Sequence, residues 1–309
     1  MNHTSIRVST LRGDQKITFD VYVKIADKMV HYLRRGDSFE GARLKRLKEK
    51  KLKNLYILND DEPHYRNYLK INIESAYDQT SQKDMQTRAE IIQGDQQSHV
   101  EEVFERPEDK HAYEATKAAT SKYVEFLTQN APAALSVLKI ENTDKNLAHH
   151  GVTVGTMAVA LSQKLKMTDP KANHFLTLGS LLHDIGLHES PINFQQPLTA
   201  LAAGDLVTYK NHPHAGIEKL KNTMHFDPQV LKIINEHEEC IDGSGFPKKL
   251  RETQLDSLSI IVSSCNAMDR LLTFEGISKT DAPKKLMVEH VGKHPLEHIR
   301  LIAEIIKSL

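Results

Sequence analysis

From about residue 113 onward, apolar residues recur at intervals of three and four positions, which is the spacing of an amphipathic helix. In residues 147–167, Val154, Ala158, Leu161 and Leu165 form one apolar face. The same spacing recurs in 113–130, 173–187, 213–223, 227–240, 257–272 and 296–309. Pro213 predicts the start of one of these helices, because proline suits the first helical turn. Strand-like alternation is scarce, so the pattern predicts an all-α bundle over residues 113–309.

The N-terminal region has a different pattern. Ile17, Phe19, Val21 and Val23 alternate with other residues, as in a half-buried strand, and residues 39–58 predict a basic helix followed by a short apolar strand. We therefore expect residues 1–75 to form a small mixed α/β domain with a regulatory or partner-binding role. The polar segment 76–112 is expected to be a helical linker. The fold class predicted for the whole chain is α+β.

Composition adds few constraints except in one residue type. Lysine plus arginine equals aspartate plus glutamate at 41 each, so no excess charge indicates nucleic acid or a membrane surface as a partner. No apolar run could span a bilayer, residues 1–10 lack the apolar core of a signal peptide, and two cysteines fit a reducing cytoplasm. Of the 17 histidines, 12 lie from His149 onward, which directs the search for chemistry to the C-terminal bundle.

Several of the predicted helices carry a histidine on or beside the apolar face. His150 lies one turn before Val154, and His237 lies three positions after Ile234. The other histidines of this kind are His183 and His212, and the carboxylates of Asp184 and Glu238 are candidates beside them. A lone histidine on such a face is more often a hydrogen-bonded core residue than a metal ligand. Several buried together would each need a partner or cost about 1–3 kcal/mol.

A group of imidazoles that converges with a carboxylate suits a transition metal. Because a carboxylate has two oxygens, Asp184, next to His183, could bridge two ions. The spacing alone does not show that the helices converge, so a metal-free helical bundle stays open as an alternative at this point.

The order of the motifs is more specific than any one of them. After His150 come "LLHDIG", "NHPHAG", "HEECIDGSGFP" and "CNAMDRLL". Over about residues 115–280 this series resembles the HD-GYP family of HD-superfamily metal-dependent phosphohydrolases, of which the chain would be a divergent member. The resemblance implies a helical domain around a binuclear or trinuclear metal centre and the hydrolysis of cyclic di-GMP.

The resemblance also implies a set of ligands and partners. The metal ligands would be His150, His183, Asp184, His212, His237, Glu238 and Asn266, with Asp184 as the bridging, catalytic carboxylate. The substrate-binding rim would be the loop of Gly243, Ser244, Gly245, Phe246 and Pro247. The cofactors would be two divalent transition-metal ions, iron or alternatively manganese. The partners would be a cyclic dinucleotide and proteins with diguanylate cyclase domains.

The chain departs from the family pattern at several of these positions. Glu238 replaces a histidine, Phe246 replaces the tyrosine of the family motif, and Leu187 replaces a lysine. Asn266 stands where the family has an aspartate ligand, if Asp269 is taken as the second acid of that motif.

Two further departures concern the metal count and the cations. Asn146 stands where members with three metals have a glutamate, which favours two ions. The family's arginine-rich segment is missing, and Lys279, Lys284 and Lys285 are imperfect substitutes. Two functions are therefore open. One is a weakened metal-dependent phosphodiesterase acting on cyclic di-GMP or a related nucleotide. The other is an inactive signalling module that binds nucleotide or a partner without hydrolysis.

Overall fold

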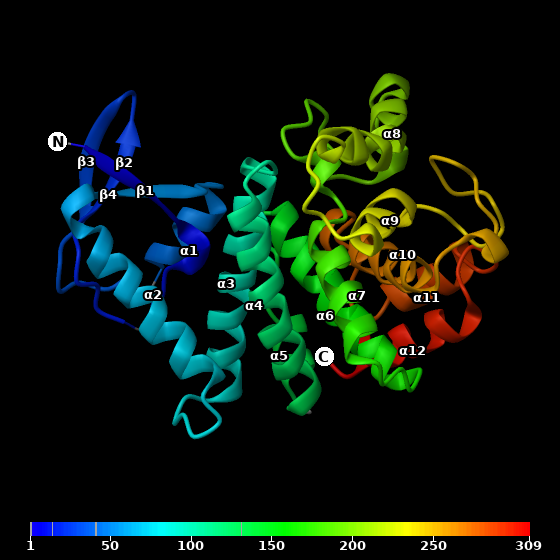
Figure 1. Cartoon of the computed structure of the whole chain (residues 1–309), viewed down its shortest axis with the longest axis horizontal. Helices are drawn as coiled ribbons and strands as arrows, with labels where there is room; N and C mark the ends of the chain where they lie inside the picture. The colour runs from blue at the N-terminus through cyan, green and yellow to red at the C-terminus, as the bar shows by residue number, and fades with distance from the viewer. Residues whose placement is uncertain (1, 14, 41, 131) are drawn as a thin grey trace. The chain divides into compact units, whose positions relative to one another are not determined.

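The computed structural model describes residues 2–13, 15–40, 42–130 and 132–309. The chain forms two compact units, Met1–Ser98 and His99–Leu309, and the division falls within helix α3 (Met85–Glu105). The predicted α+β class is confirmed, because a small sheet lies in the first unit and the second is helical (Figure 1). Among the described residues, no helix combines the length and apolar character needed to cross a bilayer.

The first unit is built on a four-stranded antiparallel sheet with strand order β1-β4-β2-β3. The elements of this unit before α3 are β1 (His3–Arg7), β2 (Val21–Ile25), β3 (Lys28–Leu33), α1 (Arg43–Glu49), β4 (Asn54–Leu58) and α2 (Glu62–Tyr77). β2 begins only at Val21, although Ile17 and Phe19 are buried before it. The alternating pattern therefore identified the buried residues correctly but placed the start of the strand too early.

The second unit consists of helices that follow one another along the chain. They are α4 (Lys110–Gln129), α5 (Ala133–Leu138), α6 (Leu147–Lys164), α7 (Pro170–Leu182), α8 (Ala203–Leu220), α9 (Pro228–Glu236), α10 (Ser257–Asp269), α11 (Ala282–Glu289) and α12 (Leu296–Lys307). A π-helical turn, Arg270–Phe274, follows α10 directly. The all-α bundle predicted from the three- and four-residue spacing is confirmed.

The core of this unit lies between α6, α7, α9, α10 and α12. Val154, Ala158 and Leu161, three residues of the apolar face predicted for α6, are fully buried in it. Val154 and Leu161 each contribute roughly 1.5–3 kcal/mol of transfer free energy by this burial. This packing fixes the positions of the helices whose ends carry the candidate ligands.

The prediction that a helix starts at Pro213 is wrong. Helix α8 begins ten residues earlier, at Ala203, and continues through Pro213. A proline inside a helix lacks the N–H that would donate to the carbonyl four residues before it. The carbonyl of Tyr209 is therefore free for another donor, and the side chain of His212 uses it, as described below.

The close crossing of α6 and α7 predicts a steric effect at Gly151. A Cβ atom there would lie 2.6 Å from the carbonyl oxygen of Leu181. We expect Gly151→Ala to lower the free energy of unfolding by about 1–3 kcal/mol, measured by urea denaturation, because neither backbone can give way easily. Gly204→Ala, also within a helix but with nothing within 4 Å, is the control and should be neutral or stabilising. Equal free energies of unfolding for the two variants would contradict the close approach of α6 to α7 at Gly151.

Candidate metal centre

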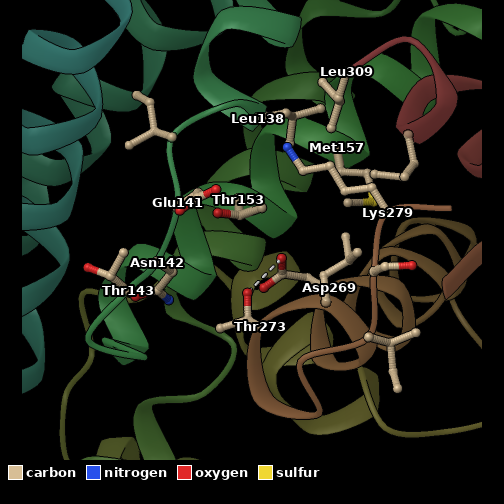
Figure 2. A pocket seen from close by; sticks show the side chains of 15 residues that line it. Leu138, Glu141, Asn142, Thr143, Thr153, Met157, Asp269, Thr273, Lys279 and Leu309 are labelled. Carbon is tan, nitrogen blue, oxygen red and sulfur yellow. Dashed lines mark hydrogen bonds between the residues drawn. The ribbon is translucent and has the colours of Figure 1, made fainter. Parts of the chain in front are cut away.

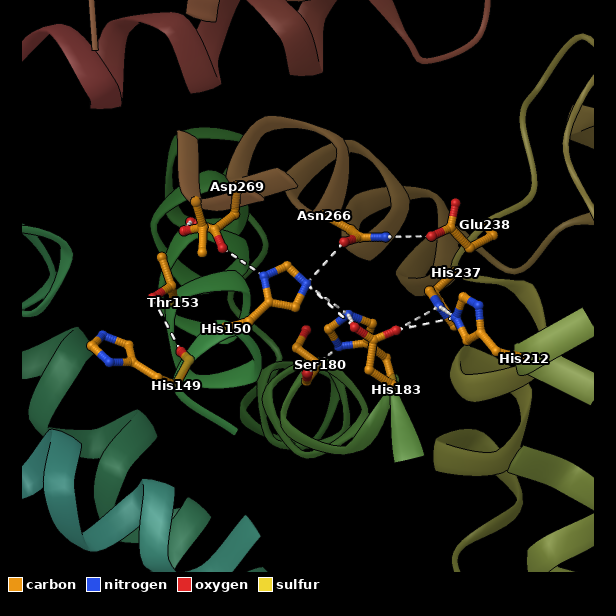
Figure 3. A network of polar contacts seen from close by, with 12 residues as sticks. His149, His150, Thr153, Ser180, His183, His212, His237, Glu238, Asn266 and Asp269 are labelled. Carbon is orange, nitrogen blue, oxygen red and sulfur yellow. Dashed lines mark hydrogen bonds and ion pairs between the residues drawn. The ribbon is translucent and has the colours of Figure 1, made fainter. Parts of the chain in front are cut away.

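Four histidines from four different helices converge in the interior of the second unit (Figure 3). His150 comes from α6, and His212 from α8, while His183 and His237 directly follow the last residues of α7 and α9. Neighbouring ring centroids lie 4.8–5.0 Å apart, and every ring is at most 2% exposed. The structure thus brings together all four histidines that the sequence pattern selected.

Three of the rings donate their Nδ1–H to a backbone carbonyl three residues earlier. The Nδ1 to O distances are 2.6 Å from His183 to Ser180, 2.7 Å from His212 to Tyr209 and 2.8 Å from His237 to Ile234. Because a carbonyl oxygen can only accept, the proton of each neutral ring lies on Nδ1. The Nε2 atom of each ring keeps its lone pair, which is available to a metal.

The local sequence explains why these carbonyls are free. His183 and His237 lie at helix C-termini, where the last carbonyls have no helical donor. His212 lies inside α8, but the missing N–H of Pro213 frees the carbonyl of Tyr209 in the same way. The dipeptide His212-Pro213 therefore sets the orientation of the imidazole.

His150 has a different partner because it lies inside α6, where the backbone carbonyls are used by the helix. Its Nδ1 lies 2.5 Å from Oδ2 of Asp269 on α10. A carboxylate that accepts from the outer nitrogen of a ligand histidine fixes the ring and increases its basicity. Asp269 is thus bonded to the outer nitrogen of His150, and its other oxygen accepts from Thr273 at 3.2 Å.

Asp184 lies between the four Nε2 atoms. Its Oδ2 is 3.6 Å from His150 Nε2 and 3.5 Å from His183 Nε2. Its Oδ1 is 3.1 Å from His212 Nε2 and 3.4 Å from His237 Nε2. The result is two groups of potential metal ligands that share one carboxylate.

The contacts inside these groups join acceptors to acceptors. The Nε2 atoms of His212 and His237 are 2.8 Å apart, and those of His150 and His183 are 3.2 Å apart. Among the described residues, no hydrogen bond satisfies the buried Oδ1 of Asp184. Lone pairs at these distances repel unless a cation lies between them, so the donor set fits a divalent transition metal in each group.

The pKa shifts in the centre come from burial and from the charges of neighbouring side chains. Burial lowers the pKa of His183 to about 3, so its ring is neutral near pH 7. Burial alone would raise the pKa of Asp184, but the neighbouring histidines outweigh it and hold that pKa well below its ordinary value. Burial also opposes the charge on His237, yet the carboxylate of Asp184 prevails and raises the pKa of that ring.

Asn266 of α10 directs its oxygen toward the centre. Its Nδ2 donates to Oε1 of Glu238 at 3.2 Å, which leaves Oδ1 facing His150 Nε2 at 3.1 Å. The same Oε1 of Glu238 also accepts from the hydroxyl of Tyr209 at 2.6 Å. Glu238 belongs to neither group of potential ligands, so its ligation stays a prediction.

Asn146, which stands in place of a glutamate, is the N-cap of α6. Its side chain caps α6 by accepting from the backbone N–H of His149 at 3.0 Å, and it donates to Glu101 at 3.1 Å. These two bonds use both ends of the amide.

Gly186 of the "HDIG" motif explains how close the elements come. It lies in the short 3-10 turn Ile185–Leu187, against α8, and a Cβ atom there would collide with the carbonyl oxygen of His212. A glycine at this position therefore lets the segment with Asp184 approach the helix with His212.

The loop predicted as the substrate rim packs against Glu239, which also binds the segment that follows the loop. This buried carboxylate accepts from the backbone N–H groups of Lys248 at 2.6 Å and Leu250 at 2.9 Å. Gly245 is buried, and a Cβ atom there would collide with the backbone of Glu239. The loop is therefore held against Glu239 at Gly245, and the segment that follows it is held at Lys248 and Leu250.

Within that loop, Phe246 lies beside the centre and Ser244 is exposed to solvent. The ring of Phe246 is half-buried, 6.0 Å from the Tyr209 ring and 6.5 Å from the His212 ring between centroids. Leu187 is buried with Tyr209 in an adjacent apolar cluster. Neither Phe246 nor Leu187 provides a polar side chain to the centre.

The three lysines suggested as substitutes for the missing arginines have other surroundings. Lys284 pairs with Asp281 at 3.1 Å, and Lys285 pairs with Glu275 at 2.8 Å. Lys279 lines a cavity of about 310 Å³ that Asp269 and Thr273 also line (Figure 2).

Sequence reasoning missed Tyr209 and Arg270. Tyr209 bonds to Glu238, and Arg270 stacks on the ring of Tyr209. The signal for Arg270 was present, because it lies four positions after Asn266 and therefore on the same helical face.

Comparison with known proteins gives matches over the region of the centre. The HD domain family model matches residues 135–273. The solved structure of Bd1817, described as an HDG"Y"P protein from Bdellovibrio bacteriovorus, has 59% sequence identity. The alignment covers 99% of this chain and 100% of that chain with a TM-score of 0.95.

Two curated relatives are described as cyclic di-GMP phosphodiesterases. PA4108 of Pseudomonas aeruginosa is 27% identical over 172 residues, which is 56% of this chain and 38% of the relative. PdeB of Borreliella burgdorferi is 23% identical over 169 residues, which is 48% of this chain and 44% of the relative. The match thus spans less than half the length of either curated relative.

The bond between Asp269 and His150 predicts a loss of metal affinity without loss of the fold. Asp269→Asn keeps an acceptor but removes the charge, so we expect metal affinity to fall roughly ten- to a hundredfold. Equilibrium dialysis with metal analysis measures it. The control is Asp256→Asn on the same helix, where asparagine caps α10 as well as aspartate does. Unchanged metal affinity in Asp269→Asn would show that the bond does not support the centre.

The raised pKa of His237 predicts that metal binding releases protons. In the metal-free protein the proton on this ring stabilises the fold at low pH, and that contribution is lost as the pH rises through the raised pKa. A metal must displace the proton, so affinity falls as the pH falls. Calorimetric titration of the metal-free protein with Mn²⁺ near pH 7, in two buffers of different ionisation enthalpy, measures the release. Heats that do not depend on the buffer would contradict it.

Proposed function

This chain belongs to the HD-GYP family of HD-domain proteins, and on that premise we propose that it is a binuclear metal-dependent phosphodiesterase. Its substrate is cyclic di-GMP or a related cyclic dinucleotide. The observation that carries the proposal is the pair of ligand groups that share Asp184. A carboxylate shared by two histidine pairs would hold two metals close together, which suits two-metal hydrolysis of a phosphodiester.

The candidate ligands divide into two groups. His150 and His183 would hold one ion, His212 and His237 would hold the other, and Asp184 would be shared between them. Asn266 would add a ligand to the first group and Glu238 to the second. Iron is the metal we favour, because most of the candidate ligands are imidazoles, and manganese is the alternative, because carboxylate oxygens suit it. When bound, such a pair polarises phosphoryl oxygens and makes water more acidic.

The residues around the candidate ligands hold those ligands in place and shape the substrate site. Burial of the four rings strengthens the charge interactions among them and Asp184, because the local dielectric is low. The loop Gly243–Pro247 forms the rim that contacts the substrate, and its Phe246 ring packs against the substrate. Tyr209 holds Glu238 through its hydroxyl.

The substrate class is supported by the names of the relatives. Both curated relatives are described as cyclic di-GMP phosphodiesterases. The N-terminal unit has a regulatory or partner-binding role in this proposal, and partners with diguanylate cyclase domains stay a prediction of the family resemblance. The site of action that we propose is the cytoplasm.

A second function is favoured by two side chains. Leu187 and Phe246 are apolar where the family pattern has a lysine and a tyrosine, so two polar groups of the family pattern are missing. A protein of this kind could keep its metals and bind a cyclic dinucleotide without cleaving it. Product formation distinguishes the two functions.

Hydrolysis of cyclic di-GMP by the metal-loaded protein tests the proposal. We expect chromatography to detect linear or monomeric products with iron or manganese, and loss of the products after chelation. Asp184→Asn should lower the rate at least about 100-fold, because it removes the shared charge between the ions. Asp169→Asn, which preserves the N-cap of the preceding helix α7, is the control. Bound metals with tight nucleotide binding and no products would favour the second function.

A further inference from the structure

Arg270 is a buried cation in the turn that follows the metal-centre helix. It directly follows α10 and begins the π-helical turn Arg270–Phe274, and it is 6% exposed. Its Cζ lies 4.8 Å from the ring centroid of Tyr209 and 5.1 Å from that of Phe274. Two aromatic rings therefore lie against the guanidinium and stabilise its charge by cation–π interaction.

The edges of the same guanidinium have no such partners. Both Nη1 and Nη2 are buried, and neither has a hydrogen-bond partner among the described residues. Leaving charged donors unsatisfied in the interior is costly, because it forfeits bonds that water would provide. Arg270 therefore has aromatic contacts on its faces, while the N–H groups of Nη1 and Nη2 are available to an acceptor.

Its two aromatic partners place Arg270 beside the metal centre, because the Tyr209 ring lies 4.9 Å from the His212 ring and the Phe274 ring lies 5.0 Å from the His150 ring between centroids. Burial acts to lower the pKa of its guanidinium, but Tyr209, Glu238 and Asp184 outweigh burial and raise that pKa. Asp184 is the shared carboxylate of the two ligand groups, and Oε1 of Glu238 is occupied by Tyr209 and Asn266. These carboxylates attract Arg270 without giving it a hydrogen bond.

We propose that Arg270 is a substrate-binding residue whose Nη groups donate to the oxygens of the phosphodiester. This inference rests on the proposed function for the presence of metals at the site. Planar guanidinium groups match two phosphate oxygens at once, which a lysine cannot do. Arg270 thereby supplies the cation that is missing at Leu187 and that Lys284 and Lys285, paired with Asp281 and Glu275, do not supply.

The position of Arg270 suits this role because the centre gains positive charge when it binds metals. Two divalent ions outweigh the charge of Asp184, so Arg270 then has an anion-attracting centre on one side and unsatisfied donors of its own. A phosphate that contacts both would satisfy the Nη groups and neutralise part of the excess charge. A side chain that only balanced Asp184 and Glu238 would instead be expected to hydrogen-bond to them.

Binding of inorganic phosphate to the manganese-loaded protein tests the proposal without requiring turnover. We expect Arg270→Met to weaken phosphate binding roughly ten- to a hundredfold, measured by calorimetry, with an unchanged metal content. Arg270→Lys should give an intermediate loss, because it keeps the charge but not the planar donors. Arg300→Met, which removes an exposed arginine paired with Glu304, is the matched control and should bind phosphate as the wild type does.

The outcomes separate this inference from the proposed function. Phosphate binding that depends on Arg270 supports the inference even if cyclic di-GMP is not cleaved. Equal phosphate affinity in Arg270→Met and the wild type overturns it even if hydrolysis is rapid. If Arg270→Met does not fold, a crystal structure of the metal-loaded wild type with phosphate decides. A phosphate oxygen within hydrogen-bond distance of Nη1 or Nη2 supports the inference, and a phosphate bound without that contact overturns it.

Discussion

The hydrogen bond on the outer nitrogen of each buried imidazole determines the rest of the centre. His183, His212 and His237 donate Nδ1–H to backbone carbonyls, and His150 donates to Asp269. When the rings are neutral, their protons lie on the outer nitrogens, and four Nε2 lone pairs point inward at the carboxylate of Asp184. Such a cluster repels itself when empty and binds cations strongly, so part of the folding free energy is stored as metal affinity.

The same bonds explain why the ligands lie where they do in the helices. A histidine at a helix C-terminus finds a free carbonyl three residues earlier, and a proline after His212 creates an equivalent carbonyl in mid-helix. His150 lies inside a helix and needs a side chain from another helix, which makes α10 part of the centre. The short dipeptides His183-Asp184 and His212-Pro213 therefore carry geometry as well as ligand chemistry.

The sequence predicted the helical bundle, with His150 and His237 on its apolar faces, because periodic spacing reports which face of a helix is buried. His183, Asp184 and His212 became candidates from their places beside the predicted helices and from the family resemblance. It could not predict that α8 continues through Pro213, since a local rule for proline ignores the tertiary packing that tolerates it. It also missed Arg270, which packs against the aromatic rings of Tyr209 from α8 and Phe274 from the π-helical turn. Side-chain partners across helices are set by packing, which spacing along one helix does not contain.

The central claim is that Asp184 bridges two transition-metal ions, and anomalous X-ray scattering at the metal absorption edges tests it most directly. A crystal of the protein purified with iron or manganese should show two peaks on opposite sides of Asp184. Each peak should lie about 2.0–2.2 Å from Nε2 of two histidines, His150 and His183 for one and His212 and His237 for the other. No peak at the centre, or a single ion that does not contact Asp184, would contradict the claim.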